Sequence, residues 1–135
     1  MNDLETKMMI SEHFEAAGRD EVAAADIYAE DAVLEFPQGG ERIRGKANIL
    51  AFRAAYPASL AFEIRRTIGS DDVWVNEYTI RYDGKPSLAV GIMEFANGRV
   101  TRETLYVTDP WEPPAWRAQW VELMDVGSTP PTQGP

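Results

Sequence analysis

The chain has 135 residues and a mass of 15.1 kDa, and its 44% hydrophobic and 26% charged residues are typical of one globular domain. It has no cysteine, which excludes thiol nucleophiles, disulfide bonds and cysteine-ligated metal sites. With 22 acidic and 13 basic residues the net charge is −9, so nucleic acid and membrane surfaces are not expected as partners. The only histidine is His13, and acid–base chemistry is left to that imidazole, a carboxylate or a tyrosine.

The start of the chain and its apolar runs predict a cytoplasmic protein. The N-terminal stretch MNDLETK is polar and does not resemble the core of a signal peptide. The longest apolar run, Leu88 to Met93, is far shorter than the roughly 18 residues that a membrane span needs. No cofactor or metal is expected, because one histidine and scattered acids do not form a ligand pattern.

The first half of the chain is predicted to be mostly helical. Apolar residues recur at helical spacing in three stretches, and one short apolar run stops at a proline, which is typical of a strand. Gly18 ends the first helix, and Asp20 caps the second. The expected elements are a helix over Leu4–Ala17, a helix from Asp20 through Tyr28, a strand over Ala32–Phe36 and a helix over Lys46–Tyr56.

After residue 57 the apolar period changes from 3.6 to about 2, which indicates strands. The dipeptides Asp83-Gly84 and Asn97-Gly98 tolerate the positive φ angles of tight hairpin turns, so the last three strands should form an antiparallel meander. The expected strands are Phe62–Ile68, Val73–Tyr82, Leu88–Phe95 and Val100–Thr108.

The C-terminal segment is rich in tryptophan and proline. Pro114 can open a short helix that carries Trp116, Trp120 and Leu123 on one face. The end of the chain, GSTPPTQGP, has the composition of a disordered tail. We therefore expect a single domain over residues 1–126 and a disordered tail over residues 127–135.

The order of these elements predicts an α+β fold with helices on one face of a curled sheet. The stretch YAEDAVLEFPQGGERIRGKANILAF, Tyr28–Phe52, and the run GRVTRET, Gly98–Thr104, resemble the SnoaL-like branch of the NTF2-like superfamily, which includes steroid delta-isomerases and polyketide cyclases. The resemblance implies a cone-shaped, curved antiparallel or mixed sheet with three N-terminal helices packed on its concave face. It also implies a homodimer, whereas the function varies widely on this scaffold.

A small-molecule pocket is expected between the helices and the sheet. Such pockets are lined mainly by aromatic and apolar side chains with a few polar groups. The alternative is that these large side chains only fill the core. The expected wall residues are Phe14, Tyr28, Phe36, Trp74, Asn76, Tyr78, Met93, Leu105 and Trp116.

Glu103 is the first candidate for a catalytic carboxylate. Strand parity places it on one face with Leu105, and the matching positions in the steroid isomerases that this chain resembles line the pocket. A carboxylate desolvated there would have a raised pKa and could act as a general base. The alternative is an ion pair on the outer face with Arg81, Arg99 or Arg102.

Hairpin register decides which other polar residues face the pocket. If the first hairpin has a two-residue turn, Asn76 faces inward, whereas a three-residue loop brings Glu77 inward as the alternative base. In the second hairpin a two-residue turn pairs Glu103 with Ile92, and a bulged three-residue turn pairs it with Gly91. Both questions stay open at the level of the sequence.

His13 lies on or beside the apolar stripe of the first helix and is a further catalytic candidate, because neutral imidazole can take a proton near pH 7. The alternative is a satisfied core residue. The catalytic positions of related enzymes are not retained. By resemblance, those of steroid isomerases fall on Phe36, near Ser11 and on Gly91, and those of limonene-type epoxide hydrolases fall on Trp74, Asn76 and Leu105.

Three functions remain open. A cofactor-independent enzyme for isomerisation, cyclisation or dehydration is favoured if Glu103 or Glu77 is buried without an arginine partner. The others are a non-catalytic domain that binds a small apolar molecule, and an interaction module that docks a partner on its outer sheet face and on Trp111 or Trp120. A homodimer is expected through outer-face residues too apolar to leave in water, namely Val73, Val75, Val90 and Ile92.

Overall fold

The structure is a computed structural model that describes residues 1–124. Six strands form one open, mixed sheet, and the predicted α+β fold is confirmed. In chain order the elements are α1 (Asp3–Ala16), α2 (Glu21–Ala24), the 3-10 helix η1 (Ala25–Ile27), β1 (Tyr28–Phe36), β2 (Glu41–Arg44), α3 (Lys46–Ala55), β3 (Leu60–Ser70), β4 (Val73–Tyr82), β5 (Lys85–Ala96), β6 (Arg99–Thr108) and the 3-10 helix η2 (Ala115–Trp120).

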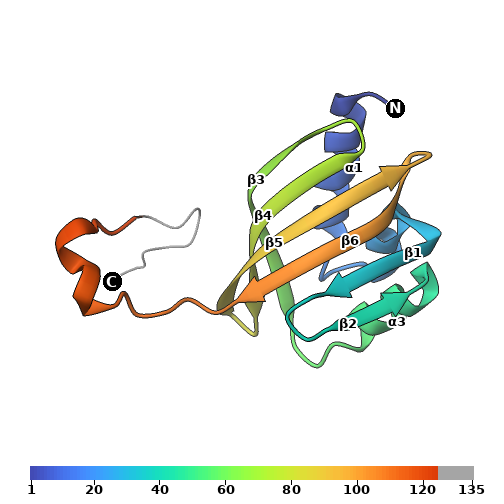
Figure 1. The fold of residues 1–135 in the computed structure, drawn as a ribbon. Coiled ribbons are helices and arrows are strands. Elements are labelled where there is room, and N and C mark those ends of the chain that lie inside the picture. The colour runs from blue at the N-terminus through green and yellow to red at the C-terminus, as the bar shows by residue number, and fades with distance from the viewer. Residues whose placement is uncertain (125–135) are drawn as a thin grey trace.

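The sheet has the strand order β2-β1-β6-β5-β4-β3, in which β1 runs parallel to β6 and all other neighbours are antiparallel. It curls around the helices, which lie on its concave face (Figure 1). The core lies between these layers, where Ile10 of α1 and Ile49 of α3 meet Leu34 and Met93 of the sheet. Helices therefore cover the concave face, and no element of residues 1–124 forms a layer on the convex outer face.

Local capping sets the ends of the first helices. Asn2 and Glu5 each accept a hydrogen bond from the other's backbone N–H at 2.8 Å, which forms a capping box at the start of α1. Gly18 follows α1 with φ of +82°, a conformation that favours glycine. Asp20 then caps α2 by accepting from the N–H of Ala23, as the sequence predicts.

The predicted second helix is too long. Helix α2 ends at Ala24, and Tyr28 is already the first residue of β1, where it pairs with Val100 of β6. This pairing reaches across more than 70 residues and overrides the local helical pattern. The sequence also did not predict β2, whose residues ERIR are few, charged and largely exposed.

The first hairpin has a two-residue turn, which is one of the two alternatives that the sequence left open. Asp83 and Gly84 adopt φ angles of +52° and +86°, and the strands continue in register so that Asn76 pairs with Gly91. Asn76 is consequently on the concave side and fully buried. Glu77 points to the outer face.

The second hairpin also has a two-residue turn, but β6 contains one residue more than the strand opposite. Phe95 pairs with Val100, whereas Glu94 pairs with Arg102, so Thr101 is a bulged residue. The Thr101 hydroxyl donates to the Glu94 carbonyl at 3.2 Å across the bulge.

This bulge decides the direction of Glu103. Glu103 pairs with Met93 on the concave side, and both expected partners, Ile92 and Gly91, are wrong. Without the extra residue the two-residue turn would pair Glu103 with Ile92, which lies with Val75 on the outer face. The bulge therefore turns the carboxylate inward.

The segment that follows β6 belongs neither to the sheet nor to the helix layer on its concave face. Residues 109–124, called here the C-terminal arm, extend away from the sheet (Figure 1). The 3-10 helix η2 begins directly after Pro114 as predicted, but it ends at Trp120, so Leu123 lies outside it. The predicted tail over residues 127–135 lies outside the described residues. Within residues 1–124 no helix is both long and apolar enough to cross a membrane.

Candidate functional site

A cavity of about 370 Å³ lies between α1, α3 and the concave face of the sheet. Its wall is mainly aromatic, and neighbouring rings pack against one another, with centroids 5.8 Å apart for Phe36 and Phe52 and 4.7 Å apart for Phe14 and Tyr78. These rings come from both helices and from three strands. The aromatic wall residues are Phe14, Phe36, Phe52, Tyr56, Phe62, Tyr78 and Tyr82.

Glu103 supplies a carboxylate to this aromatic cavity, although only 1% of the residue is exposed. Its Oε1 atom accepts a hydrogen bond from the hydroxyl of Tyr28. Arg53 of α3 places Nη2 3.6 Å from the same oxygen and 3.4 Å from the Tyr28 hydroxyl. Oε1 is therefore held from two sides.

The second carboxylate oxygen of Glu103, Oε2, differs from Oε1 in its hydrogen bonding. Among the described residues Oε2 has no hydrogen-bond partner, and it lies beside Gly91 of β5. A Cβ atom at Gly91 would be 3.4 Å from Oε2 and 3.5 Å from the hydroxyl of Tyr78. The missing side chain thus leaves room next to both polar groups.

Burial and neighbouring charges keep the two tyrosines near Glu103 protonated and Arg53 positively charged at neutral pH. Burial raises the pKa of Tyr28 well above its usual range, and burial together with the Glu103 charge raises the pKa of Tyr78. Burial alone would lower the pKa of Arg53, but Tyr28 and Glu103 beside it hold that pKa above its ordinary value. At neutral pH both tyrosines are hydroxyl donors and Arg53 is a cation.

The structure resolves the alternatives for Glu103 in an unexpected way. Its side chain points inward, yet it has an arginine partner, and this partner is Arg53 of the helix layer. Arg81, by contrast, pairs with Glu63 at 3.1 Å, and Arg102 lies 4.0 Å from Glu94. The expectation of a desolvated carboxylate without an arginine therefore needs correction.

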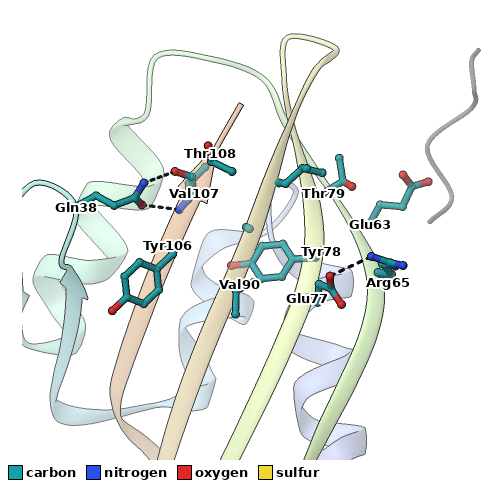
Figure 2. Close-up of a pocket in the computed structure, with 12 residues that line it drawn as sticks. Gln38, Glu63, Arg65, Glu77, Tyr78, Thr79, Val90, Tyr106, Val107 and Thr108 are labelled. Atoms are coloured by element: carbon teal, nitrogen blue, oxygen red, sulfur yellow. Dashed lines mark hydrogen bonds and ion pairs between the residues drawn. The ribbon is translucent and has the colours of Figure 1, made fainter. Parts of the chain in front are cut away.

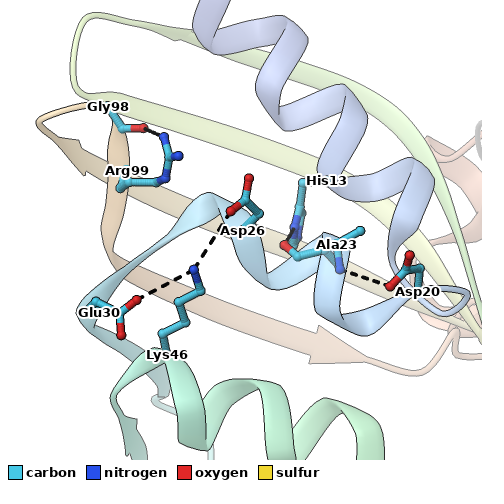
Figure 3. A network of polar contacts seen from close by, with 9 residues as sticks. His13, Asp20, Ala23, Asp26, Glu30, Lys46, Gly98 and Arg99 are labelled. Carbon is cyan, nitrogen blue, oxygen red and sulfur yellow. Dashed lines mark hydrogen bonds and ion pairs between the residues drawn. The ribbon is translucent and has the colours of Figure 1, made fainter.

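His13 also borders the cavity and is nearly buried. Its Nδ1 atom lies 2.7 Å from the carbonyl oxygen of Ala24, beside the α2 backbone shown in Figure 3, so Nδ1 carries the proton. Burial lowers the pKa of His13, Glu103 opposes this effect and Arg53 adds to it. The ring is neutral at pH 7, with Nε2 as an acceptor.

The other predicted wall residues divide into two groups. Phe14, Phe36, Tyr78 and Leu105 line the cavity with Glu103 and His13. Three residues are packed in the core away from it, since Trp74 donates to the Asp71 carbonyl at 3.0 Å, Asn76 accepts from the Thr67 hydroxyl at 2.9 Å, and Met93 is fully buried.

Two predicted site residues lie elsewhere. Trp116 is not a wall residue, because it belongs to the projecting C-terminal arm and is 73% exposed. Glu77 is on the outer face, where Arg65 and Arg66 contact its two oxygens at 3.1 and 2.6 Å. The two-residue turn of the first hairpin accounts for this outward position.

Sequence reasoning missed Arg53 as a site residue. The signal was present in α3, where Ile49, Phe52 and Arg53 share one amphipathic face and Tyr56 follows one turn later. An arginine on the apolar face of a helix is a candidate partner for a buried acid, and the sequence does not say which acid. Within residues 1–124 no cluster of three or more histidine or acidic side chains is placed to hold a metal ion.

A curled sheet covered by helices, with an aromatic cavity and a buried carboxylate between the two layers, is typical of the NTF2-like fold. The sequence profile of the SnoaL-like domain family matches residues 10–103, and the chain belongs to this family. None of the curated proteins compared with the chain matches it.

Solved structures confirm the fold and the family. An NTF2-like protein of unknown function from Burkholderia xenovorans LB400 is 43% identical, with a TM-score of 0.85 over 93% of this chain and 99% of that chain. A candidate ketosteroid isomerase from Kribbella flavida DSM 17836 is 27% identical, with a TM-score of 0.83 over 93% and 95%. A candidate polyketide cyclase from Sinorhizobium meliloti, 24% identical with a TM-score of 0.63 over 73% and 93%, shares the fold alone.

Proposed function

We propose that this protein binds a small, largely apolar molecule in the cavity and that a hydroxyl group of the ligand donates a hydrogen bond to Oε2 of Glu103. The cavity volume of about 370 Å³ lies within the range of small-molecule sites, which is roughly 300–1,000 Å³. The aromatic wall favours a flat apolar body, because stacked and edge-to-face contacts add to the burial of apolar area.

The proposal rests on the unequal contacts of the two Glu103 carboxylate oxygens. Tyr28 and Arg53 fix Oε1, so the side chain does not need to reorganise when a ligand enters. Oε2 has no partner among the described residues and lies next to the gap at Gly91. A carboxylate oxygen that faces a cavity and has no protein donor is an acceptor that a ligand hydroxyl can satisfy.

Tyr78 adds a donor beside this acceptor. Its hydroxyl borders the same gap, and its raised pKa keeps it protonated at neutral pH. A ligand oxygen placed between the two groups donates to Glu103 and accepts from Tyr78. A hydroxyl group fits this pair better than an ether, which cannot donate.

Proton transfer is the second candidate function, because Oε2 of Glu103 and the Tyr78 hydroxyl are a base and a donor beside one cavity. The ion pair with Arg53 departs from the isolated carboxylate that the general-base hypothesis requires. Binding is therefore proposed ahead of catalysis. An assay for catalysis is α-proton exchange of 2-tetralone in D₂O by NMR, in which an enzyme would accelerate exchange and E103Q would abolish the acceleration.

Two probes that differ in one hydrogen-bond donor test the binding function. Isothermal titration of the wild type with 2-naphthol and with its methyl ether, 2-methoxynaphthalene, should show at least about tenfold tighter binding of 2-naphthol, since a hydrogen bond to a charged group contributes about 1.5–3 kcal/mol. E103Q should lose this preference, and E77Q, an outer-face control, should retain it. Equal affinities in the wild type, or a preference that survives in E103Q, would refute the proposal.

A further inference from the structure

The C-terminal arm carries large apolar side chains that nothing in the described chain covers. No residue of the arm is buried, and Trp111, Trp116 and Trp120 are 72%, 73% and 73% exposed. Leu123 and Met124 follow them and are also exposed. Isolated exposed apolar residues are ordinary, but several on one short segment mark an interaction site.

The root of the arm is fixed and directs it away from its own domain. The Gln38 side chain donates to the carbonyl of Val107 and accepts from its N–H, both at 2.7 Å, which holds the end of β6 (Figure 2). Ser87 donates to the first arm residue, Asp109, at 2.9 Å. From this anchored point the arm extends outward (Figure 1).

A hollow on the outer face lies beside this root. This outer hollow has a volume of about 170 Å³ and crosses β4, β5 and β6 (Figure 2). Val90 and Tyr106, which pair across β5 and β6, are 38% and 43% exposed in it. Thr79 of β4 and Thr108, the last residue of β6, also line it. The arm therefore departs from the rim of the hollow.

We propose that the arm of one copy packs its tryptophans over the outer hollow of a second copy, and that two such exchanged arms hold a homodimer. A two-fold axis near the hollow brings the root of each arm to the rim of the other copy's hollow, because an isologous interface repeats every contact. Threonine and tyrosine hydroxyls at the rim offer acceptors for the indole N–H groups. The arm, and not the convex outer face alone, then supplies the main contact between the two copies.

The arm is also present in the alignments with two solved structures. Residues 1–108 make up 80% of the chain, so a match over 93% of it must extend into the arm. The proteins from Burkholderia xenovorans and Kribbella flavida match to that extent at 43% and 27% identity. Both proteins therefore have residues that align with the arm, so the segment is shared with these two relatives.

The apolar area is sufficient for a stable dimer. A tryptophan buries roughly 150–250 Å² when it is covered, so the three tryptophans of one arm can bury roughly 450–750 Å². Two arms and the faces they cover then reach the roughly 1,200–2,000 Å² of a stable interface.

Light scattering coupled to size exclusion tests the role of the arm. Two copies of 15.1 kDa should elute with a mass of about 30 kDa, and W116S/W120S should raise the dimer dissociation constant at least tenfold. The control L4S/V22S removes two exposed apolar residues outside the arm and should leave the constant unchanged. A monomeric wild type at 100 μM, or a dimer unaffected by W116S/W120S, would overturn the proposal.

Cross-linking tests the hollow as the docking site. Because the chain has no cysteine, an introduced cysteine is the only thiol that the cross-linker can reach. A tagged A118C variant, altered in the arm, is mixed with an untagged V90C variant, altered in the hollow, and treated with bismaleimidoethane. A covalent product of one tagged and one untagged chain is expected. V22C in place of V90C should give no such product. Equal yields from V90C and V22C, or no product from V90C, would overturn the assignment of the hollow.

Discussion

Tyr28, the first residue of β1, donates its hydroxyl hydrogen bond to Oε1 of Glu103 on the parallel neighbour β6. Only 2% of Tyr28 and 1% of Glu103 are exposed, so water does not compete for this contact. The pair joins two segments 75 residues apart and meets Arg53 of α3 at the same oxygen. One polar cluster thus connects the helix layer, the sheet and the cavity.

Removal of the Tyr28 hydroxyl should destabilise the protein. In Y28F the Oε1 atom of Glu103 loses the hydrogen bond from the Tyr28 hydroxyl, and hydrogen bonds to charged groups contribute about 1.5–3 kcal/mol. Urea unfolding should show a loss of that size. The matched control is Y56F, because Tyr56 is 38% exposed and its hydroxyl has no partner among the described residues, so a change within about 0.5 kcal/mol is expected. Equal losses in both variants would contradict the account.

Arg53 and Glu103 should be strongly coupled. R53M leaves a buried acid without its cation, and such a change costs about 3–5 kcal/mol. In the double variant R53M/E103Q the loss should be smaller than the sum of the single losses by about 0.5–3 kcal/mol. R42M breaks the surface pair with Glu35 and should cost under about 1 kcal/mol. Additive losses at Arg53 and Glu103 would show that the two side chains do not interact.

Substitution of Gly91 by alanine should weaken ligand binding without lowering the stability of the fold. A Cβ atom there meets Oε2 of Glu103 at 3.4 Å and the Tyr78 hydroxyl at 3.5 Å, which are ordinary contacts that the fold tolerates. G91A should therefore be as stable as the wild type or up to about 1 kcal/mol more stable, because alanine loses less entropy than glycine on folding. Its affinity for 2-naphthol should fall at least tenfold in isothermal titration. Wild-type affinity in G91A would place the ligand away from this gap.

His13 should make stability depend on pH. Its pKa is lowered in the folded state by burial, whereas the unfolded state has the ordinary value of 6.5. Below about pH 6.5 the unfolded chain binds more protons at His13 than the folded chain, so the free energy of unfolding falls as the pH falls. H13N retains a donor toward the Ala24 carbonyl without titrating. Urea unfolding between pH 7.5 and 5.5 should show a weaker pH dependence for H13N, and an identical dependence would contradict the assignment.

Local signals in the sequence predicted much of the sheet and both turns. Asp83-Gly84 and Asn97-Gly98 each place two adjacent residues at positive φ, as expected for hairpin turns. The sequence left the length of the first turn open, and the observed two-residue turn places Asn76 inward and Glu77 outward. Such signals depend on a few neighbouring residues.

Features that depend on distant residues were not predictable in the same way. The bulge at Thr101 turns Glu103 inward, and nothing in the local pattern distinguishes it from a regular strand. The partner of Glu103 comes from α3, so Arg53 could be found only once α3 was placed over the sheet. Tyr28 likewise leaves its predicted helix because β6 offers it a strand to pair with.

A crystal structure of the wild type with bound 2-naphthol would show whether Oε2 of Glu103 receives a ligand hydroxyl in the aromatic cavity. We expect the naphthyl ring against Phe14, Phe62 and Tyr78, with its oxygen about 2.5–3.0 Å from Oε2. An empty cavity at saturating 2-naphthol, or a ring bound with its oxygen turned away from Glu103, would contradict this expectation.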